Sequence, residues 1–262
     1  MKNILTLRRL SQFFLVALIA FLGIRHQVVG GGPEGAAPLD SYCAFGALET
    51  AVYFAQTGQF LAKTNYSNFI IFGALAVVTV LAGAAFCSWI CPLGTIQEWL
   101  AGLAKKIFGR QYNIPVRIHR PLRYLRYVVL GLIIYLTVIS FKLIFESYDP
   151  FKILFHFKFE ETTAFVVFGG IIIASLLVDR FWCKYLCPLG AVISILGKFN
   201  LVKIRRDSKE CIDCGLCNRR CTMNIDVAKA ATVPETDCVK CLDCIDACPK
   251  NGALTLGIGG GK

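Results

Sequence analysis

The sequence predicts a membrane α-helical domain of four transmembrane helices, built as a duplicated helix hairpin, followed by a small α+β domain. The 262 residues are 56% hydrophobic and have a mean hydropathy of +0.60, which is too apolar for a soluble domain of this size. Four apolar runs account for this composition, and all of them precede residue 199. The rest of the chain, called the tail below, is polar and rich in cysteine. We therefore expect a transmembrane domain over residues 1–198 and a cysteine-rich domain over residues 199–262.

The four apolar runs have the length of membrane-spanning helices. With its flanking residues, each run extends to roughly 20 residues, enough for a helix to cross about 30 Å of hydrocarbon. The first run follows Lys2, Arg8 and Arg9, as in a cleaved signal peptide, but Arg25 directly after it makes a poor cleavage site. We therefore expect the first helix to stay in the protein. The cores of the runs lie at residues 13–24, 69–86, 127–141 and 164–178.

The distribution of basic residues predicts the orientation in the membrane. Most of the 28 Lys and Arg residues lie at the N-terminus, between the second and third runs, and in the tail. Because basic residues collect on the cytoplasmic side, both termini and the tail are expected in the cytoplasm, with the chain crossing the inner (cytoplasmic) membrane several times. The net charge of +11 follows from this distribution. No basic stripe interleaved with stacking aromatics indicates nucleic-acid binding, so the expected partner is the lipid bilayer.

A repeated string indicates that the membrane domain is duplicated. The string C-x3-C-P-L-G runs from Cys87 to Gly94 and again from Cys183 to Gly190. A second string, S-Y-x-x-F, occurs before each copy and ends at Phe45 and at Phe151. The second S-Y-x-x-F string lies ten residues nearer to its C-x3-C-P string than the first does, and the same order of strings in both halves is typical of a duplicated unit. On a helix, cysteines at i and i+4 share one face, and the following proline ends that turn. We therefore expect four cysteines to meet at the cytoplasmic ends of the second and fourth helices: Cys87, Cys91, Cys183 and Cys187.

The tail carries a different cysteine string, also twice. The string C-x2-C-x2-C-x3-C begins at Cys211 and again at Cys238. Three thiolates at this spacing wrap one corner of a [4Fe-4S] cluster, and the fourth is directed at the other cluster of a two-cluster ferredoxin. Zinc is the alternative, but structural zinc sites use paired C-x2-C knuckles instead. The predicted ligands are Cys211, Cys214, Cys217 and Cys248 for cluster 1, and Cys238, Cys241, Cys244 and Cys221 for cluster 2.

Two features surround these strings. Thr222 stands where the bacterial ferredoxin pattern has proline, as Pro249 does after Cys248. Because this proline shapes a turn and is not a ligand, the departure leaves the cluster prediction in place. Alternating residues at 201–206 and 253–256 predict two short strands on either side of the cysteine strings. The tail is therefore expected to be a small ferredoxin domain with two [4Fe-4S] clusters.

The four membrane cysteines have three possible roles. They can hold an additional iron-sulfur cluster, act as two dithiol pairs, or pack as small hydrophobic residues. Packing alone gives no reason to repeat both the spacing and the proline. The repeat therefore favours a cofactor or redox role over packing.

The combination of features resembles the NapH family of membrane iron-sulfur proteins. The same core is similar to the membrane half of NosR and to the core of the CcoG/FixG proteins. The paired C-x3-C-P-L-G strings are the specific part of this resemblance, because the tail cysteines are generic to ferredoxins. The resemblance implies an electron-transfer subunit that links the quinone/quinol pool to other redox subunits of a membrane oxidoreductase complex. The CcoG likeness implies the alternative, an assembly or maintenance factor that reduces a metal such as copper, or a thiol, for another membrane enzyme.

Three residues near the expected outer helix ends lie outside both kinds of cysteine string, and no catalytic residue can be assigned. Cys43 has no partner for a disulfide, and packing is its expected role. Glu49 and Asp149 can exchange protons with a quinol, although solvation at the surface is the commoner role of such carboxylates.

Overall fold

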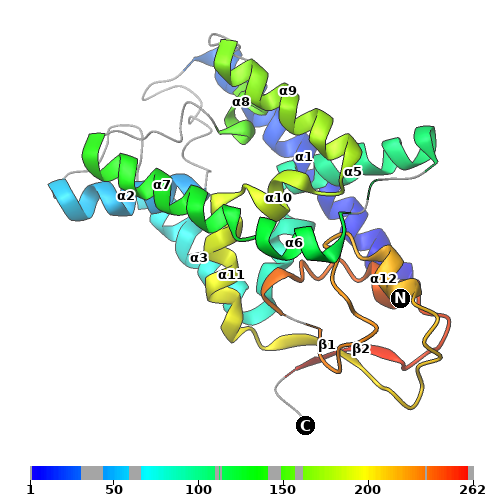
Figure 1. Ribbon diagram of the computed structural model, residues 1–262. Coiled ribbons are helices and arrows are strands. Elements are labelled where there is room, and N and C mark those ends of the chain that lie inside the picture. The colour runs from blue at the N-terminus through cyan, green and yellow to red at the C-terminus, as the bar shows by residue number, and fades with distance from the viewer. Residues whose placement is uncertain are drawn as a thin grey trace.

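The computed structural model describes residues 2–30, 44–58, 66–109, 112, 114–140, 149–156, 162–233 and 235–258. Cys43 lies outside the described residues. Within them, a helical region precedes a tail that contains two strands, and the N-terminus of the first helix lies beside the tail (Figure 1).

Three helical stretches are long and apolar enough to cross a membrane: Asn3–Val29, Phe69–Trp89 and Arg117–Ser140. They contain helices α1 (Lys2–Val29), α3 (Tyr66–Ala82) and α7 (Leu125–Ser140), and they coincide with the first three predicted runs. The fourth run forms α9 (Thr162–Leu177), whose 16 residues are fewer than the 27, 21 and 24 residues of the three stretches. At 1.5 Å per residue α9 is about 24 Å long, less than the hydrocarbon core. Three spans therefore match the prediction by length and composition, and the fourth remains a prediction.

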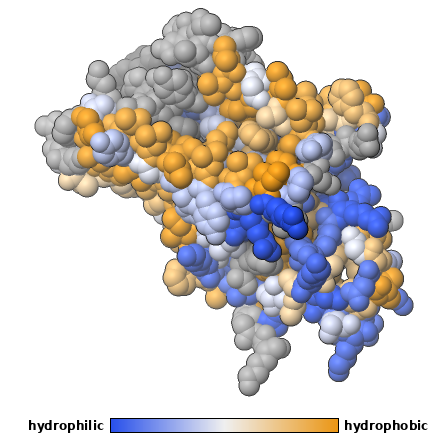
Figure 2. All heavy atoms as spheres, in the orientation of Figure 1, coloured by the Kyte–Doolittle hydropathy of each residue, from blue (hydrophilic) through white to orange (hydrophobic). Residues whose placement is uncertain are grey.

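The surface of the helical region supports a membrane location. Many large apolar side chains of α1 and α7 are exposed, among them Phe13, Phe14, Phe21 and Val128. Figure 2 shows apolar residues over the helical region and hydrophilic residues over the tail. An apolar surface of this extent is stable against lipid and not against water. The chain is an integral membrane protein.

The remaining helices connect the membrane-length stretches or pack against them. Their bounds are α2 (Ala44–Thr57), α4 (Phe86–Trp89), α5 (Pro92–Phe108), α6 (Val116–Leu122), α8 (Pro150–His156), α10 (Phe181–Tyr185) and α11 (Pro188–Leu196), with 3-10 turns η2 (Gly83–Ala85) and η4 (Gly197–Phe199).

Both C-x3-C-P strings form the same helix break. The second cysteine of each, Cys91 or Cys187, is extended and stands directly before a new helix, α5 or α11, that begins at the proline. Proline suits the first position of a helix because it has no N–H to leave unpaired and its φ angle is already helical. Each string therefore ends one helix and starts another, which places its two cysteines on either side of a sharp turn.

Helices of the first half of the membrane region, which contains the first C-x3-C-P string, pack against helices of the second half. Helix α5 packs against α9, and α11 packs against α3. In the same way α8 packs against α1, and α2 packs against α7 (Figure 1). Each half therefore completes its packing with helices of the other half.

The tail contains a two-stranded antiparallel sheet of β1 (Val202–Arg206) and β2 (Leu254–Ile258). Val202 lies opposite Ile258, and Arg206 opposite Leu254, which confirms the two predicted strands to within two residues. Between the strands lie the single-turn helices α12 (Leu216–Arg220) and α13 (Asp243–Asp246) and the 3-10 turn η5 (Glu235–Asp237). The two cysteine strings share a backbone conformation, because φ is positive at Asp213 and Gly215 in the first and at the matching Lys240 and Leu242 in the second.

Candidate functional site

Two small cavities in the tail are each lined by four cysteines. The first tail cavity, of about 20 Å³, is lined by Cys211, Cys214, Cys217 and Cys248. The second tail cavity, also of about 20 Å³, is lined by Cys221, Cys238, Cys241 and Cys244. Each cavity thus combines three cysteines of one string with the last cysteine of the other. The donor set of four thiols in each cavity fits a [4Fe-4S] cluster, and the assignment of these cysteines as cluster ligands stays a prediction.

A cluster and a single zinc ion make different demands on four thiols. In the part of the chain that the structure describes, no three His, Cys, Asp or Glu side chains converge closely enough to hold a single metal ion. The preference for a [4Fe-4S] cluster over zinc rests on the spacing of the two cysteine strings.

The second tail cavity is the more buried of the two. Cys238, Cys241 and Cys244 are buried, whereas Cys214 in the first tail cavity is exposed. Burial raises the pKa of the Cys241 thiol to about 12, with a further contribution from the carboxylate of Asp243. A thiolate at this position is therefore costly unless a nearby cation compensates it, as bound iron does. The hydroxyl of Thr222, the residue that replaces proline, lies 4.0 Å from the Cys241 sulfur.

The second tail cavity faces the membrane region and is tied to it by hydrogen bonds. Arg8 of α1 donates to the carbonyl oxygen of Cys241 at 2.9 Å and to Asp243 at 3.0 Å. Ser88 donates to the carbonyl oxygen of Val239 at 2.6 Å. Trp89 donates its indole N–H to the carbonyl oxygen of Lys240 at 3.1 Å. The cysteine string of the second cavity therefore rests directly on the first C-x3-C-P string.

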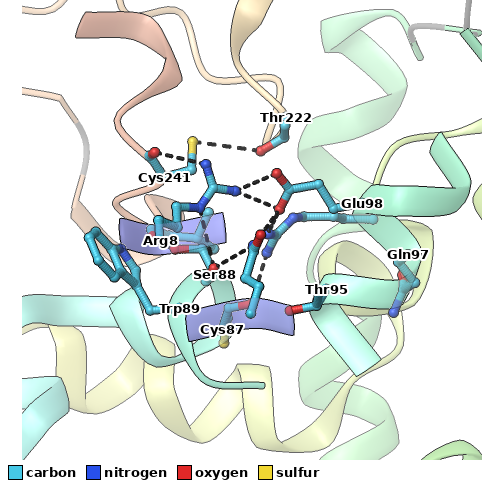
Figure 3. Close-up of polar contacts among 12 residues, drawn as sticks. Arg8, Cys87, Ser88, Trp89, Thr95, Gln97, Glu98, Thr222 and Cys241 are labelled. Carbon is cyan, nitrogen blue, oxygen red and sulfur yellow. Dashed lines mark hydrogen bonds and ion pairs between the residues drawn. The ribbon is translucent and has the colours of Figure 1, made fainter. Parts of the chain in front are cut away.

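A buried charge network continues from Arg8 to the membrane cysteines (Figure 3). Glu98 of α5 accepts from Arg8 at 2.5 Å and from Arg180 at 2.6 Å. Arg180, whose side chain is fully buried, also donates to the carbonyl oxygen of Cys87 at 3.0 Å. The chain of contacts Cys87, Arg180, Glu98, Arg8 and Cys241 thus connects the two cysteine-rich regions without a break.

Glu98 is ionised in this network. Burial alone would raise its pKa, but the guanidinium groups of Arg180 and Arg8 outweigh burial and hold the pKa below its ordinary value. Asp243 differs, because burial raises its pKa by more than the contact with Arg8 lowers it. Glu98 therefore carries the negative charge that both buried arginines need.

The four membrane cysteines lie near one another in the structure, and their role as cofactor ligands stays a prediction. The thiol of Cys187 is close enough to interact electrostatically with those of Cys87, Cys91 and Cys183, and Cys87 interacts with Cys91 and Cys183. All four are free thiols and partly buried. The Gly190 N–H donates to the sulfur of Cys187 at 3.3 Å, and the side-chain amide of Gln97 donates to the sulfur of Cys183 at 3.4 Å. The group, called the membrane thiols below, is therefore one site built from both halves.

A second group of contacts holds the tail to the helical region, at Arg123 and at helices α7 and α11. Asp237 accepts from Arg123 and, at 2.5 Å, from Arg126 of α7. Ser194 of α11 donates to the carbonyl oxygen of Thr236 at 3.0 Å. The sequence assigned Arg8, Arg123 and Arg126 to the positively charged side of the membrane. The structure adds that these arginines form ion pairs with carboxylates of the tail. No local pattern in the sequence predicts these pairs.

An apolar cavity of about 260 Å³ lies beside the membrane thiols. Its walls include Cys91, Cys187 and the carboxylate residue Asp149. Asp149 and Glu49 are both buried, 6% and 4% exposed. The expectation that these carboxylates are solvated at the surface is therefore wrong. The short helix α8, which follows Asp149, packs against α1 and α9 inside the bundle.

Comparisons with known proteins agree with this site. The family model described as a 4Fe-4S binding domain matches twice, over residues 64–111 and 161–207, and each match contains one C-x3-C-P string. YccM of Escherichia coli, named as a candidate electron transport protein, is 30% identical over 98% of this chain and 76% of its own length. The ferredoxin-type protein NapH of Haemophilus influenzae is 29% identical over 92% of this chain and 85% of its own length. The methylamine utilization ferredoxin-type protein MauN of Methylobacillus flagellatus is 31% identical over 97% of this chain and 90% of its own length. No solved structure matches.

Proposed function

Because the chain belongs to the NapH-type family of membrane iron-sulfur proteins, we propose that it is the electron-transfer subunit linking a quinone/quinol to other redox subunits of a membrane complex. Its role is membrane iron-sulfur electron transfer. The names of the relatives, which include ferredoxin-type proteins and a candidate electron transport protein, do not favour the alternative of an assembly or maintenance factor. The observation that carries the proposal is the unbroken chain of contacts between the membrane thiols and the second tail cavity.

We propose three iron-sulfur clusters. Two occupy the tail cavities with the crossed ligand sets, and the third is held by Cys87, Cys91, Cys183 and Cys187. The two matches of the 4Fe-4S family model support the third, because they cover the membrane strings and leave out the cysteines of the tail. When bound, such clusters supply one-electron transfer at potentials set by burial and by hydrogen bonds to sulfur.

The three sites lie in series from solvent to membrane. The first tail cavity contains the exposed Cys214, which suits exchange with a partner protein. The second tail cavity is buried against the membrane region, where Arg8 and Ser88 hold its backbone in place. The membrane thiols come next, beside an apolar cavity. This chain therefore positions a redox route from a partner at the tail surface to a carrier in the bilayer.

The proposal also includes a topology. It comprises four spans as a duplicated hairpin over residues 1–198, and the two-cluster ferredoxin domain over residues 199–262. Three candidate spans support it. So does the packing between the two halves, of α5 against α9 and of α11 against α3. The basic residues Arg8, Arg123 and Arg126 contact the tail, as expected if the tail and both termini share the cytoplasmic side of the inner membrane.

Iron counting on full-length protein purified without oxygen tests the third cluster. We expect about twelve iron atoms per chain, and about eight in Cys87→Ser or Cys183→Ser, because each half supplies two ligands. The double variant should lose little more, since residues that act as one unit are non-additive. Cys43→Ser is the matched control, because Cys43 belongs to neither cysteine string. Wild-type protein that holds eight iron atoms, unchanged in both variants, would show that the membrane thiols hold no cluster.

A further inference from the structure

We propose that helix α5 is an interfacial membrane anchor, which lies along the bilayer surface on the side of the tail and inserts an apolar stripe between the lipid head groups. This stripe, called the α5 stripe below, consists of Trp99, Leu103 and Ile107, which are 42%, 50% and 64% exposed. The inference goes beyond the proposed function, because it requires neither a bound cluster nor electron transfer.

Helix α5 has three distinct faces, because residues three or four positions apart share one side of a helix. One face is buried and contains Gln97, Ala101 and Ala104. A second face is polar or small and contains Glu98, Gly102 and Lys105. The third face is the α5 stripe, which is apolar and exposed. A helix that is packed on one side, polar on another and apolar on a third is typical of a helix at a membrane surface.

Contacts with α1 show how these faces are oriented. Arg8 lies near the end of α1 that is beside the tail (Figure 1), and it bonds to Glu98 on the polar face of α5. Phe13 is five residues further along α1, about 7.5 Å further from the tail. Its ring contacts that of Trp99, with the ring centroids 6.5 Å apart. The polar face of α5 therefore faces the tail, and the α5 stripe faces the part of α1 that crosses the membrane.

The surroundings of the α5 stripe select lipid as its partner. Phe13 is 67% exposed and belongs to a stretch able to cross a membrane, so the α5 stripe continues a surface that meets acyl chains. Helix α5 begins at Pro92, three residues after the candidate span Phe69–Trp89 ends. Its start is thereby held at the boundary of the bilayer. A partner protein in the cytoplasm would meet the polar face instead.

The residue types along the α5 stripe also suit the head-group region. Tryptophan is enriched at membrane–water interfaces, where its ring is apolar and its N–H is polar. Lys106 is exposed and lies seven residues after Trp99, on the same side of the helix, so its ammonium group can extend to lipid phosphates. Cys91 stands directly before α5. The membrane thiols therefore lie near the depth of the head groups and not in the middle of the bilayer.

The decisive measurement is fluorescence quenching of full-length protein in lipid nanodiscs, with a dansyl amino acid in place of Leu103. The matched control carries the same probe in place of Gly102, the preceding residue, which is exposed on the polar face and where a Cβ meets nothing within 4 Å. An interfacial helix sinks only about 5–10 Å into the boundary between head groups and acyl chains. Lipids brominated near the glycerol end of the acyl chain should therefore quench the probe at Leu103 more strongly than lipids brominated near the methyl end. Iodide in the buffer should quench the probe at Gly102 and not at Leu103.

Three results would overturn the inference. Quenching by iodide at Leu103 would show that the α5 stripe faces water. Stronger quenching from the methyl end would show that α5 lies in the bilayer core. A probe at Leu103 that neither lipid nor iodide quenches would show that protein covers the α5 stripe.

A pair of variants tests whether lipid contact holds α5 in place. Leu103→Glu and Gly102→Glu add the same charge one residue apart, but only the first puts it against lipid. In nanodiscs, amide hydrogen exchange in the second half of α5 should be at least about tenfold faster in Leu103→Glu than in wild type, and unchanged in Gly102→Glu. Equal exchange in the two variants would contradict an anchoring role. Iron content of the same samples tests the proposed function separately, because neither residue belongs to a cysteine string.

Discussion

Replacing Glu98 by glutamine should destabilise the whole protein, because Glu98 is the shared counter-charge of two buried arginines. The side chains of Arg8 and Arg180 are 4% and 0% exposed, and that of Glu98 is 22% exposed. Glutamine keeps the shape and one hydrogen-bond acceptor. The variant therefore removes the negative charge and leaves two guanidinium groups in the interior. Among the described residues, Asp243 is then the remaining carboxylate contact of Arg8.

The size of the effect follows from burial. Removing one partner of a buried ion pair costs about 3–5 kcal/mol, because the other charge stays in a low-dielectric site without compensation. The partial exposure of Glu98 argues for the lower end, about 3 kcal/mol. For a chain of this size that corresponds to a fall of roughly 6–12 °C in Tm.

Thermal unfolding in detergent micelles, followed by circular dichroism, measures this. The matched control is Lys105→Gln. Lys105 lies on the same helix as Glu98, α5, and this variant breaks its ion pair with Asp179. Lys105 is 50% exposed, so its variant should change stability by at most about 1 kcal/mol. If the Tm of Glu98→Gln equals that of Lys105→Gln within experimental error, the stability of the network does not depend on the charge of Glu98, and the reasoning is refuted.

Two further predictions follow from the same region. The pKa of Glu98 is held below its ordinary value of 4.5, so its ionised form stabilises the folded state above pH 4.5, and this contribution is lost as the pH falls through the lowered pKa. The Tm difference between wild type and Glu98→Gln, recorded from pH 7 downward, should therefore shrink below pH 4.5, and a constant difference would contradict this assignment. Gly94→Ala should reduce iron bound at the membrane thiols, because a Cβ at Gly94 clashes with the carbonyl oxygen of Cys87. Gly102→Ala on the same helix is the control, because a Cβ there meets nothing within 4 Å, and it should be neutral or stabilising by about 0.5–1 kcal/mol. Equal iron content in the two variants would show that the close approach of Gly94 to Cys87 does not affect the site.

The local features of this protein were predictable from sequence because short-range geometry determines them. The helix break at each C-x3-C-P string follows from the proline, and the grouping of cysteines around each tail cavity follows from the spacing of the strings. The two strands of the tail were predictable for the same reason, since they depend on alternation over a few residues.

Features that depend on tertiary packing were not predictable in the same way. Asp149 follows an expected outer loop, and only the packing of α8 inside the bundle turns it into a wall of the cavity. Arg8 and Arg126 looked like solvated basic residues beside a membrane. Their partners Asp243 and Asp237 lie in the tail, and no spacing relates them.

The pairing of Arg8 with Asp243 has a consequence for how the protein is made. The two residues are 235 positions apart, so α1 cannot take its final place until the second cysteine string has folded against it. Closing a loop of this length costs conformational entropy before the contact returns any, and contacts between residues so far apart slow folding. A chain without the second cysteine string would leave Arg8 without its contacts with Cys241 and Asp243.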